Sequence, residues 1–163
     1  MIEVKVAGIV IDSNSNSPVM LLRDIAADRI LPIYIGPAEA ANLAYALENV
    51  KAVRPLTIDL MKLLVEGAGA KVKRVNVTAI RDDTFYAEII LEAAGKLIAI
   101  DARPSDSVAL ALRTNSPIYV AEEIMNNLST VMTLDEETKL KEIRSHLRNT
   151  DLEDLGNYQG PGP

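Results

Sequence analysis

The sequence contains no cysteine and a single histidine, His146, among its 163 residues. The absence of cysteine excludes disulfide bonds and zinc–thiolate sites, and it is typical of a cytoplasmic protein. One histidine close to the C-terminus argues against Ser-His-Asp or Cys-His catalysis, because both need an imidazole beside the nucleophile. A metal site would use oxygen ligands, which favour a hard cation such as Mg²⁺ or Mn²⁺, and we expect no organic cofactor.

The sequence also has few aromatic residues, no excess of positive charge and no long apolar run. The chain has one Phe, five Tyr and no Trp, and its net charge is −6. It therefore offers a polyanion neither a domain-wide positive field nor a broad stacking platform, although a small local site is compatible with this composition. No run approaches the ~18 apolar residues that span a membrane, and the N-terminus alternates rather than showing a signal peptide's apolar core. We expect no membrane partner.

Apolar residues alternate or cluster in short segments along most of the chain, and turn residues separate these segments. Neighbouring hairpins favour an α+β fold with a mixed, largely antiparallel sheet and packed helices over a doubly wound parallel sheet. We expect strands near 2–11, 19–22, 29–35, 75–79, 85–91, 97–100 and 117–120, and helices near 37–49, 56–66, 104–115 and 121–128.

Two segments, 33–39 and 100–106, share one plan of apolar run, proline, small residue, acid and helix. Their prolines, Pro37 and Pro104, stand where a missing N–H costs nothing at a helix start. The correspondence suggests an internal β-β-β-α duplication.

After about residue 128 the sequence changes to a charged helical segment followed by a Gly- and Pro-rich end. We therefore predict one domain over 1–128 and an appendage over 129–163. Thr133 and Glu136 have the spacing of a capping box before a charged helix near 135–148. The final residues, rich in Gly and Pro, are expected to be disordered.

Polar side chains gather where the predicted helices begin. The segment from Asp101 to Asp106 holds two carboxylates, a guanidinium and a hydroxyl, and a second charged helix start runs from Arg54 to Asp59. An acid at a helix start commonly does no more than satisfy free N–H groups. A positive charge there is unfavourable unless an acid pairs with it, so Arg54 and Arg103 each imply a carboxylate partner.

These residues have two interpretations. In the structural one, the arginines and acids of both helix starts form one buried ion-pair network that ties two helices together. In the functional one, the arginines clamp a phosphate, hydroxyls and helix N-termini donate hydrogen bonds, and carboxylates hold Mg²⁺ for phosphodiester cleavage. The candidate site residues are Glu39, Arg54, Thr57, Asp59, Asp101, Arg103, Ser105 and Asp106.

Five ordered motifs run through the predicted domain. They are Leu31-Pro32-Ile33-Tyr34-Ile35-Gly36-Pro37-Ala38-Glu39-Ala40, Arg54-Pro55-Leu56-Thr57-Ile58-Asp59-Leu60, Thr84-Phe85-Tyr86-Ala87, Ile100-Asp101-Ala102-Arg103-Pro104-Ser105-Asp106 and Pro117-Ile118-Tyr119-Val120. In this order the chain resembles the bifunctional nuclease family. The resemblance implies a compact α+β domain, commonly a homodimer, that cleaves RNA and DNA with little sequence specificity, and it places the candidate residues at the family's polar motif positions.

One position departs from the family pattern. After Arg-Pro the family usually reads x-Thr-His-Asp-Leu, whereas this chain has Ile58 at the histidine position.

Our first interpretation is a metal-assisted nuclease, with Asp59 and Asp106 positioning a cation or water and Arg54 and Arg103 stabilising phosphate charge. The alternatives are a non-catalytic dimeric scaffold or regulatory module, in which the Arg/Asp network is structural, and a binder of small anions.

Overall fold

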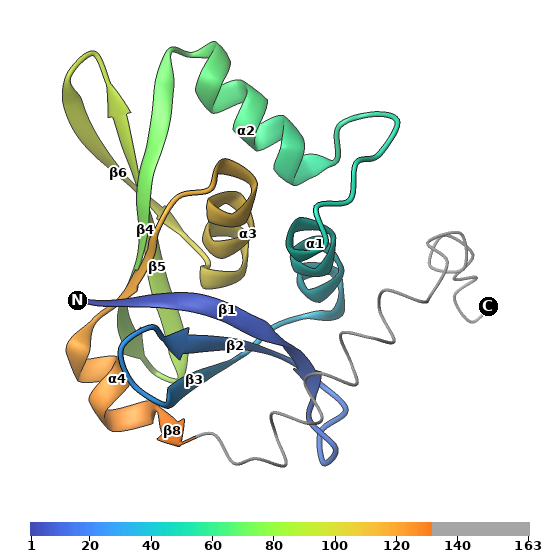
Figure 1. Cartoon of the computed structure of the whole chain (residues 1–163), viewed down its shortest axis with the longest axis vertical. Coiled ribbons are helices and arrows are strands. Elements are labelled where there is room, and N and C mark those ends of the chain that lie inside the picture. The colour runs from blue at the N-terminus through green and yellow to red at the C-terminus, as the bar shows by residue number, and fades with distance from the viewer. Residues whose placement is uncertain (132–163) are drawn as a thin grey trace. The chain divides into compact units, whose positions relative to one another are not determined.

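A computed structural model describes residues 1–131, which form one mixed sheet with four helices (Figure 1). The strand order is β6-β5-β4-β7-β1-β2-β3-β8, and every neighbouring pair is antiparallel except β4 and β7. The predicted α+β class is confirmed. The elements are β1 (Ile2–Ile11), β2 (Pro18–Asp24), β3 (Arg29–Tyr34), α1 (Pro37–Leu47), α2 (Thr57–Gly67), β4 (Ala70–Arg81), β5 (Thr84–Ala93), β6 (Lys96–Ala102), α3 (Pro104–Thr114), β7 (Ile118–Val120), α4 (Glu122–Leu128) and β8 (Thr130–Val131).

Two three-stranded antiparallel meanders, β1–β3 and β4–β6, lie on either side of β7. Each meander leads directly into a helix that starts with proline, α1 at Pro37 and α3 at Pro104. The duplication suggested by the sequence stays a hypothesis, because a shared order of elements does not by itself establish a common origin.

Two tight turns join the strands of the second meander. Asp82 and Asp83 both have positive φ, as do Ala94 and Gly95. Two consecutive residues with positive φ give a hairpin turn whose twist matches that of the flanking strands. The Asp82–Asp83 turn fixes the register of β5 beside β4, and the Ala94–Gly95 turn fixes that of β6 beside β5 and thereby the point at which the chain leaves the sheet for α3.

The core is one continuous cluster of buried side chains. Helix α3 is the central helix, packing against α1, α2, β4 and β5, and Val108 and Leu110 on it are almost fully buried. Figure 1 shows α1 and α3 side by side, with α2 above them in this view. Since α3 is held on several sides, the side chains at its start have a fixed position.

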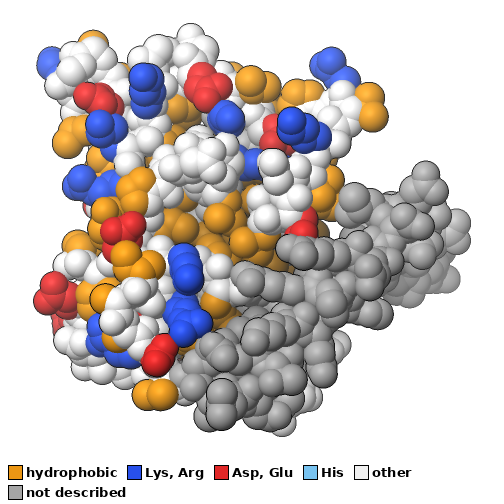
Figure 2. All heavy atoms as spheres, viewed as in Figure 1, with side chains coloured by type: hydrophobic (Ala, Val, Ile, Leu, Met, Phe, Trp, Pro, Cys, Tyr) orange, Lys and Arg blue, Asp and Glu red, His pale blue; other side chains and the backbone are white. Residues whose placement is uncertain are grey.

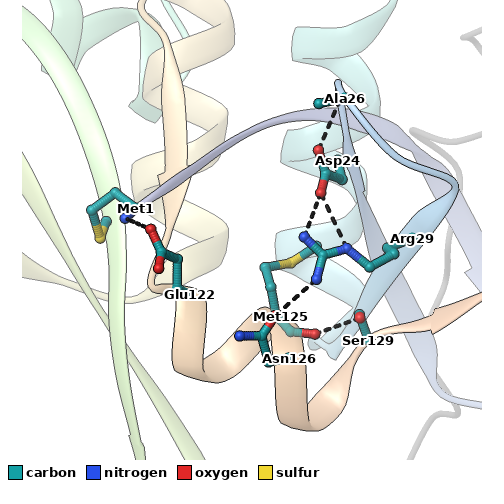
Figure 3. Close-up of polar contacts among 8 residues, drawn as sticks. All are labelled: Met1, Asp24, Ala26, Arg29, Glu122, Met125, Asn126 and Ser129. Carbon is teal, nitrogen blue, oxygen red and sulfur yellow. Dashed lines mark hydrogen bonds and ion pairs between the residues drawn. The ribbon is translucent and has the colours of Figure 1, made fainter.

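A polar cluster fastens the β2–β3 hairpin to α4 (Figure 3). Nε and Nη2 of Arg29 donate to one carboxylate oxygen of Asp24 at 3.2 and 2.7 Å, and Nη1 donates to Asn126 on α4 at 2.9 Å. The Ala26 N–H donates to Asp24 as well, at 2.8 Å. These hydrogen bonds, the Ala26 N–H first and Arg29 second, hold the pKa of the buried Asp24 carboxyl below its usual range.

The expected helices and strands are all present in the described part, but their bounds differ. Strand β4 begins at Ala70, five residues before the predicted start, because bulges between Val72 and Arg74 and between Val77 and Ala79 interrupt its alternation. The short β8 pairs with β3 beyond residue 128. The predicted domain division stays a prediction, and the expected helix near 135–148 and tail lie outside the described residues. None of the described helices is long and apolar enough to cross a membrane.

Candidate functional site

Arg103 joins the starts of α1 and α3. It is the N-cap of α3, directly after β6. Its Nε donates to Oδ2 of Asp106 at 2.7 Å, and its Nη1 donates to Oε1 of Glu39 at 2.8 Å. Both acids lie in the first turn of their helices. The two carboxylates, Asp106 first, raise the pKa of the Arg103 guanidinium. We call these three residues the Arg103 cluster.

A cleft of about 370 Å³ opens beside the Arg103 cluster. Three segments far apart in the sequence form it: the end of β3 with the start of α1, the β4–β5 turn, and the start of α3. Ser105, one of the predicted site residues, lines this cleft and is only 6% exposed. The cleft lining therefore combines the Arg103 cation, the Glu39 and Asp83 carboxylates and a hydroxyl at two helix N-termini, where anions are favoured. Asp106 contacts Arg103 but does not itself line the cleft. Its lining is Ile33, Tyr34, Ile35, Gly36, Glu39, Asp83, Thr84, Phe85, Arg103, Pro104 and Ser105.

Gly36 lets the Glu39 side chain reach Arg103. Gly36 is the N-cap of α1 with φ of −77°, a conformation open to any residue. A Cβ built on Gly36 would lie 2.2 Å from Oε2 of Glu39. The glycine is therefore needed for space rather than for backbone freedom, and any side chain here would push the carboxylate away.

Asp59 belongs to a second, separate cluster. Its Oδ1 lies 3.0 Å from Nε of Arg113 in an ion pair, and its Oδ2 accepts the Leu56 N–H at the start of α2. Arg113 also donates to the Val50 carbonyl at 2.9 Å, and its side chain is 7% exposed. Arg113 lies in the last turn of α3, ten residues from Arg103, which is about 15 Å along a helix.

The prediction of one buried network that joins both helix starts is therefore wrong. Asp59 pairs with Arg113 instead of Arg103, and the Arg103 side chain is 65% exposed. Within residues 1–131, Arg54 makes no ion pair. Arg54 and Thr57 are both exposed, and the N-cap of α2 is Leu56 rather than Thr57. The two helix starts thus form two sites and not one.

Asp101 also lies apart from the Arg103 cluster. It is exposed on β6 and stands opposite Glu88 on β5. Glu88 in turn accepts a hydrogen bond of 2.7 Å from Asn76 on β4. Since strand side chains alternate between faces, Asp101 lies on the face opposite to Ile100 and Ala102, away from the core.

Ile58, at the family's histidine position, is a core residue. It is the buried residue of α2, 5% exposed, and belongs to the hydrophobic cluster. It is not part of the cleft lining. In this chain, position 58 therefore supports α2 and removes no polar group from the Arg103 cleft.

The predicted site residues did not include Arg113, which pairs with Asp59, or Tyr34 and Phe85, which line the cleft. Arg113 is a basic residue in the last turn of a predicted helix, a position that favours positive charge. The sequence pattern did not indicate that Asp59 would be its partner. Tyr34 and Phe85 line the cleft although they were noted only as motif residues. Tyr34 donates to Asp12 at 3.1 Å, and this hydrogen bond raises the pKa of the Tyr34 hydroxyl.

The acids that could hold a metal at this site are Glu39 and Asp106. Within residues 1–131 no group of three or more acidic or histidine side chains has the arrangement of a metal site. Glu39 and Asp106 both face Arg103, so a divalent cation would compete with the guanidinium for their oxygens. Hard oxygen donors suit Mg²⁺ or Mn²⁺.

Comparison with known proteins agrees with this arrangement of motifs. The family model of the bifunctional nuclease domain matches residues 20–133. The chain belongs to this family. The match runs from the third residue of β2 through β8 and includes the Arg103 cluster and its cleft.

Some relatives of this chain are named as nucleases, and others have no functional name. An uncharacterized protein of Mycobacterium tuberculosis is 45% identical over 123 residues, which cover 76% of this chain and 73% of that protein. Bifunctional nuclease 1 of Oryza sativa is 29% identical over 119 residues, and bifunctional nuclease 2 of Arabidopsis thaliana is 30% identical over 108 residues. These matches cover 71% and 64% of this chain but only 36% and 33% of the plant proteins.

Proposed function

We propose that the protein is a nuclease that hydrolyses phosphodiester bonds in RNA and DNA with little sequence specificity, acting at the Arg103 cleft. One observation carries the proposal: Arg103 is held by two carboxylates at two helix starts, beside a cleft of about 370 Å³. Membership of the bifunctional nuclease family, and the names of the plant relatives, support the same class of activity.

The three residues of the Arg103 cluster and Ser105 each have a role in this proposal. Arg103 binds non-bridging phosphate oxygens and stabilises the charge that develops on them. Glu39 and Asp106 orient the attacking water, and one of them accepts its proton as the new P–O bond forms. The leaving oxygen departs with the electrons of the broken P–O bond and takes a proton from solvent. The Ser105 hydroxyl and the free N–H groups of α3 donate to the phosphate. Mg²⁺ or Mn²⁺, bound by the same carboxylates, would supply a more acidic water.

Two of the remaining predicted site residues, Arg54 and Thr57, have a supporting role in the proposal. Arg54 and Thr57 are exposed at the start of α2 and can contact a nucleic-acid strand outside the cleft. On the face shown in Figure 2, basic and acidic side chains are interspersed rather than gathered in one basic field. Binding therefore depends on a few local contacts, which fits a net charge of −6. Catalytic roles for Asp59 and Asp101 stay predictions.

We further propose a homodimer that works in the cytoplasm. The dimer follows from the family resemblance, and the location follows from the cysteine-free sequence. A second candidate function, a non-catalytic scaffold or regulatory module, has one specific observation in its favour. Both carboxylates beside the cleft are already engaged by Arg103, as a structural network requires.

Cleavage of labelled RNA, single-stranded DNA and double-stranded DNA separates the two functions. We expect cutting by the wild type with Mg²⁺ or Mn²⁺, none with EDTA, and none by an Asp106→Asn, Arg103→Ala double variant that retains its circular dichroism spectrum. Arg23→Ala is the matched control, since Arg23 pairs with Asp28 outside the cleft. Cutting that survives in the double variant would move the activity elsewhere, and no cutting under any condition would favour the scaffold.

A further inference from the structure

Strand β6 leaves one edge of the sheet open within residues 1–131. Six of its seven residues are exposed, among them Leu97 at 61%, Ile98 at 44% and Ile100 at 43%. Open edges are usually blunted by proline, by charge or by being very short, as is the two-residue β8 at the other edge. The only charges on β6 are Lys96 and Asp101, near its two ends. An exposed apolar edge of this length is a pairing surface.

The apolar side chains of β6 extend the core face of the sheet. Ile98 stands opposite Leu91, and Ile100 stands opposite Ile89. Ile89 is buried and Leu91 packs against the core, so this row continues outward from the hydrophobic cluster until it reaches solvent. A partner that pairs with β6 would therefore gain backbone hydrogen bonds and cover apolar side chains together.

We propose that β6 pairs antiparallel with β6 of a second copy of this chain, so that Ala99 lies opposite Ala99. The strand runs from Lys96 to Ala102, and Ala99 is its midpoint, so this register pairs the strand over its whole length. A two-fold axis perpendicular to the sheet requires one residue to face its own copy. Ala99 is small, and each Ile98 then faces Ile100 of the other copy.

Charge favours the antiparallel direction. Lys96 stands at the first residue of β6 and Asp101 near the last. Parallel in-register pairing would place Lys96 beside Lys96 and Asp101 beside Asp101, whereas the antiparallel register puts each of these charges opposite an uncharged residue, Ala102 or Leu97.

The same register adds a residue to the candidate site. Lys96 of the second copy lies opposite Ala102, one residue before Arg103, and on the same face of the sheet as Ile98 and Ile100. Its ammonium group would join the positive charge beside each cleft. This part of the inference rests on the proposed function, while the pairing itself does not.

Charge substitution at Ala99 tests the pairing, because the residue meets itself. Ala99 is exposed, so Ala99→Lys and Ala99→Asp are compatible with folding. By sedimentation velocity we expect a dimeric wild type, two monomeric variants, and a restored dimer in an equimolar mixture of the variants. Leu64→Lys on the exposed face of α2 is the matched control, expected to stay dimeric. A monomeric wild type, dimers of both variants, or loss of the dimer in Leu64→Lys alone would overturn the proposal.

A single cysteine gives an independent readout in a chain that has none. Antiparallel partners have Cα atoms about 4.5–5.5 Å apart, within the range of a disulfide. Oxidised Ala99→Cys should run as a cross-linked dimer on a non-reducing gel, and Ser13→Cys, in the exposed β1–β2 turn, should not. Equal cross-linking of both variants would contradict the register.

Lys96→Ala tests the contribution to the cleft. We expect the dimer to persist and the Kd for a single-stranded oligonucleotide to rise several-fold, with Lys71→Ala on β4 as the matched control. An unchanged Kd would remove Lys96 from the cleft. If the wild type neither binds nor cuts nucleic acid, the proposed function fails, and the Ala99 variants still decide the pairing.

Discussion

Arg103 and Glu39 are 64 residues apart in the sequence, yet Nη1 of Arg103 donates to Oε1 of Glu39 at 2.8 Å. With Asp106 on the other side at 2.7 Å, the guanidinium lies between two carboxylates. Both acids begin helices, so the contact couples the start of α1 to the start of α3. The Arg103 side chain is 65% exposed, which leaves it open to a ligand.

The two carboxylates are expected to have opposite effects on binding and on cleavage. In a Glu39→Gln, Asp106→Asn double variant, Arg103 loses its negative partners and phosphate meets less repulsion. We expect the Kd for a single-stranded oligonucleotide to fall several-fold, and cleavage to fall by about 10²-fold or more, since general base catalysis contributes roughly that factor. Fluorescence anisotropy and a gel assay on the same samples measure both. A double variant that loses binding and cleavage together would assign the acids to substrate binding.

Gly36→Ala is expected to disturb the site while leaving the fold intact. The new Cβ would lie 2.2 Å from Oε2 of Glu39, so the carboxylate must shift, and we expect this to disturb its ion pair with Arg103. We expect cleavage to fall about 10- to 100-fold, as for other displacements of a positioned group, with little change in Tm. Gly67→Ala is the matched control, because nothing lies within 4 Å of its added Cβ. If the Gly36→Ala variant cut nucleic acid as fast as Gly67→Ala, Glu39 would be dispensable.

Arg113 is expected to affect stability and not the cleft. Its side chain is 7% exposed, pairs with Asp59 and holds the Val50 carbonyl, so Arg113→Ala leaves a partly buried carboxylate without its partner. Breaking a buried pair costs about 3–5 kcal/mol, and because Asp59 is 26% exposed we expect about 2–3 kcal/mol in urea unfolding. Oligonucleotide binding per folded molecule should be unchanged. Reduced binding at full folding would place the Asp59 cluster in the functional site after all.

Most of the fold could be predicted from the sequence, because periodicity and turn residues agree along residues 1–131. Pro37 and Pro104 correctly marked two helix starts. The predicted strand at β4 is too short, because two bulges interrupt the alternation of apolar and polar residues from which strands are predicted.

The candidate site could be predicted only in its local part. Arg103 and Asp106 are three residues apart, so the geometry of a helix start suffices to bring them together. The pairing of Asp59 depends on how α2 packs on α3, which no local pattern encodes. The place of Asp101 could have been predicted, since alternation along a strand puts it on the other face from its neighbours.

Asp24 should make stability depend on acid pH. Hydrogen bonds from the Ala26 N–H and Arg29 lower the pKa of the folded carboxyl below the value of 3.8 expected for the unfolded chain. The unfolded chain therefore binds the proton first, so the stabilisation is present above about pH 4 and is lost as pH falls through the lower folded pKa. We expect the free energy of unfolding to fall more steeply below pH 4 in the wild type than in Asp24→Asn. Parallel slopes would show that other acids dominate.

Ile58→His tests whether the family's usual histidine could act at the Arg103 cleft. Ile58 is 5% exposed within the core, and it does not line the cleft. A histidine there would exchange buried apolar surface for a polar ring, at a cost of about 1–3 kcal/mol in urea unfolding. Cleavage per folded molecule should not rise, because the imidazole would face the core side of α2 while the proposed cleft lies at the starts of α1 and α3. Ile58→Met, which keeps the apolar volume, is the control for packing. If Ile58→His cut nucleic acid markedly faster than both Ile58→Met and the wild type, the active site would have to include the start of α2, and Asp59 would return as a catalytic candidate.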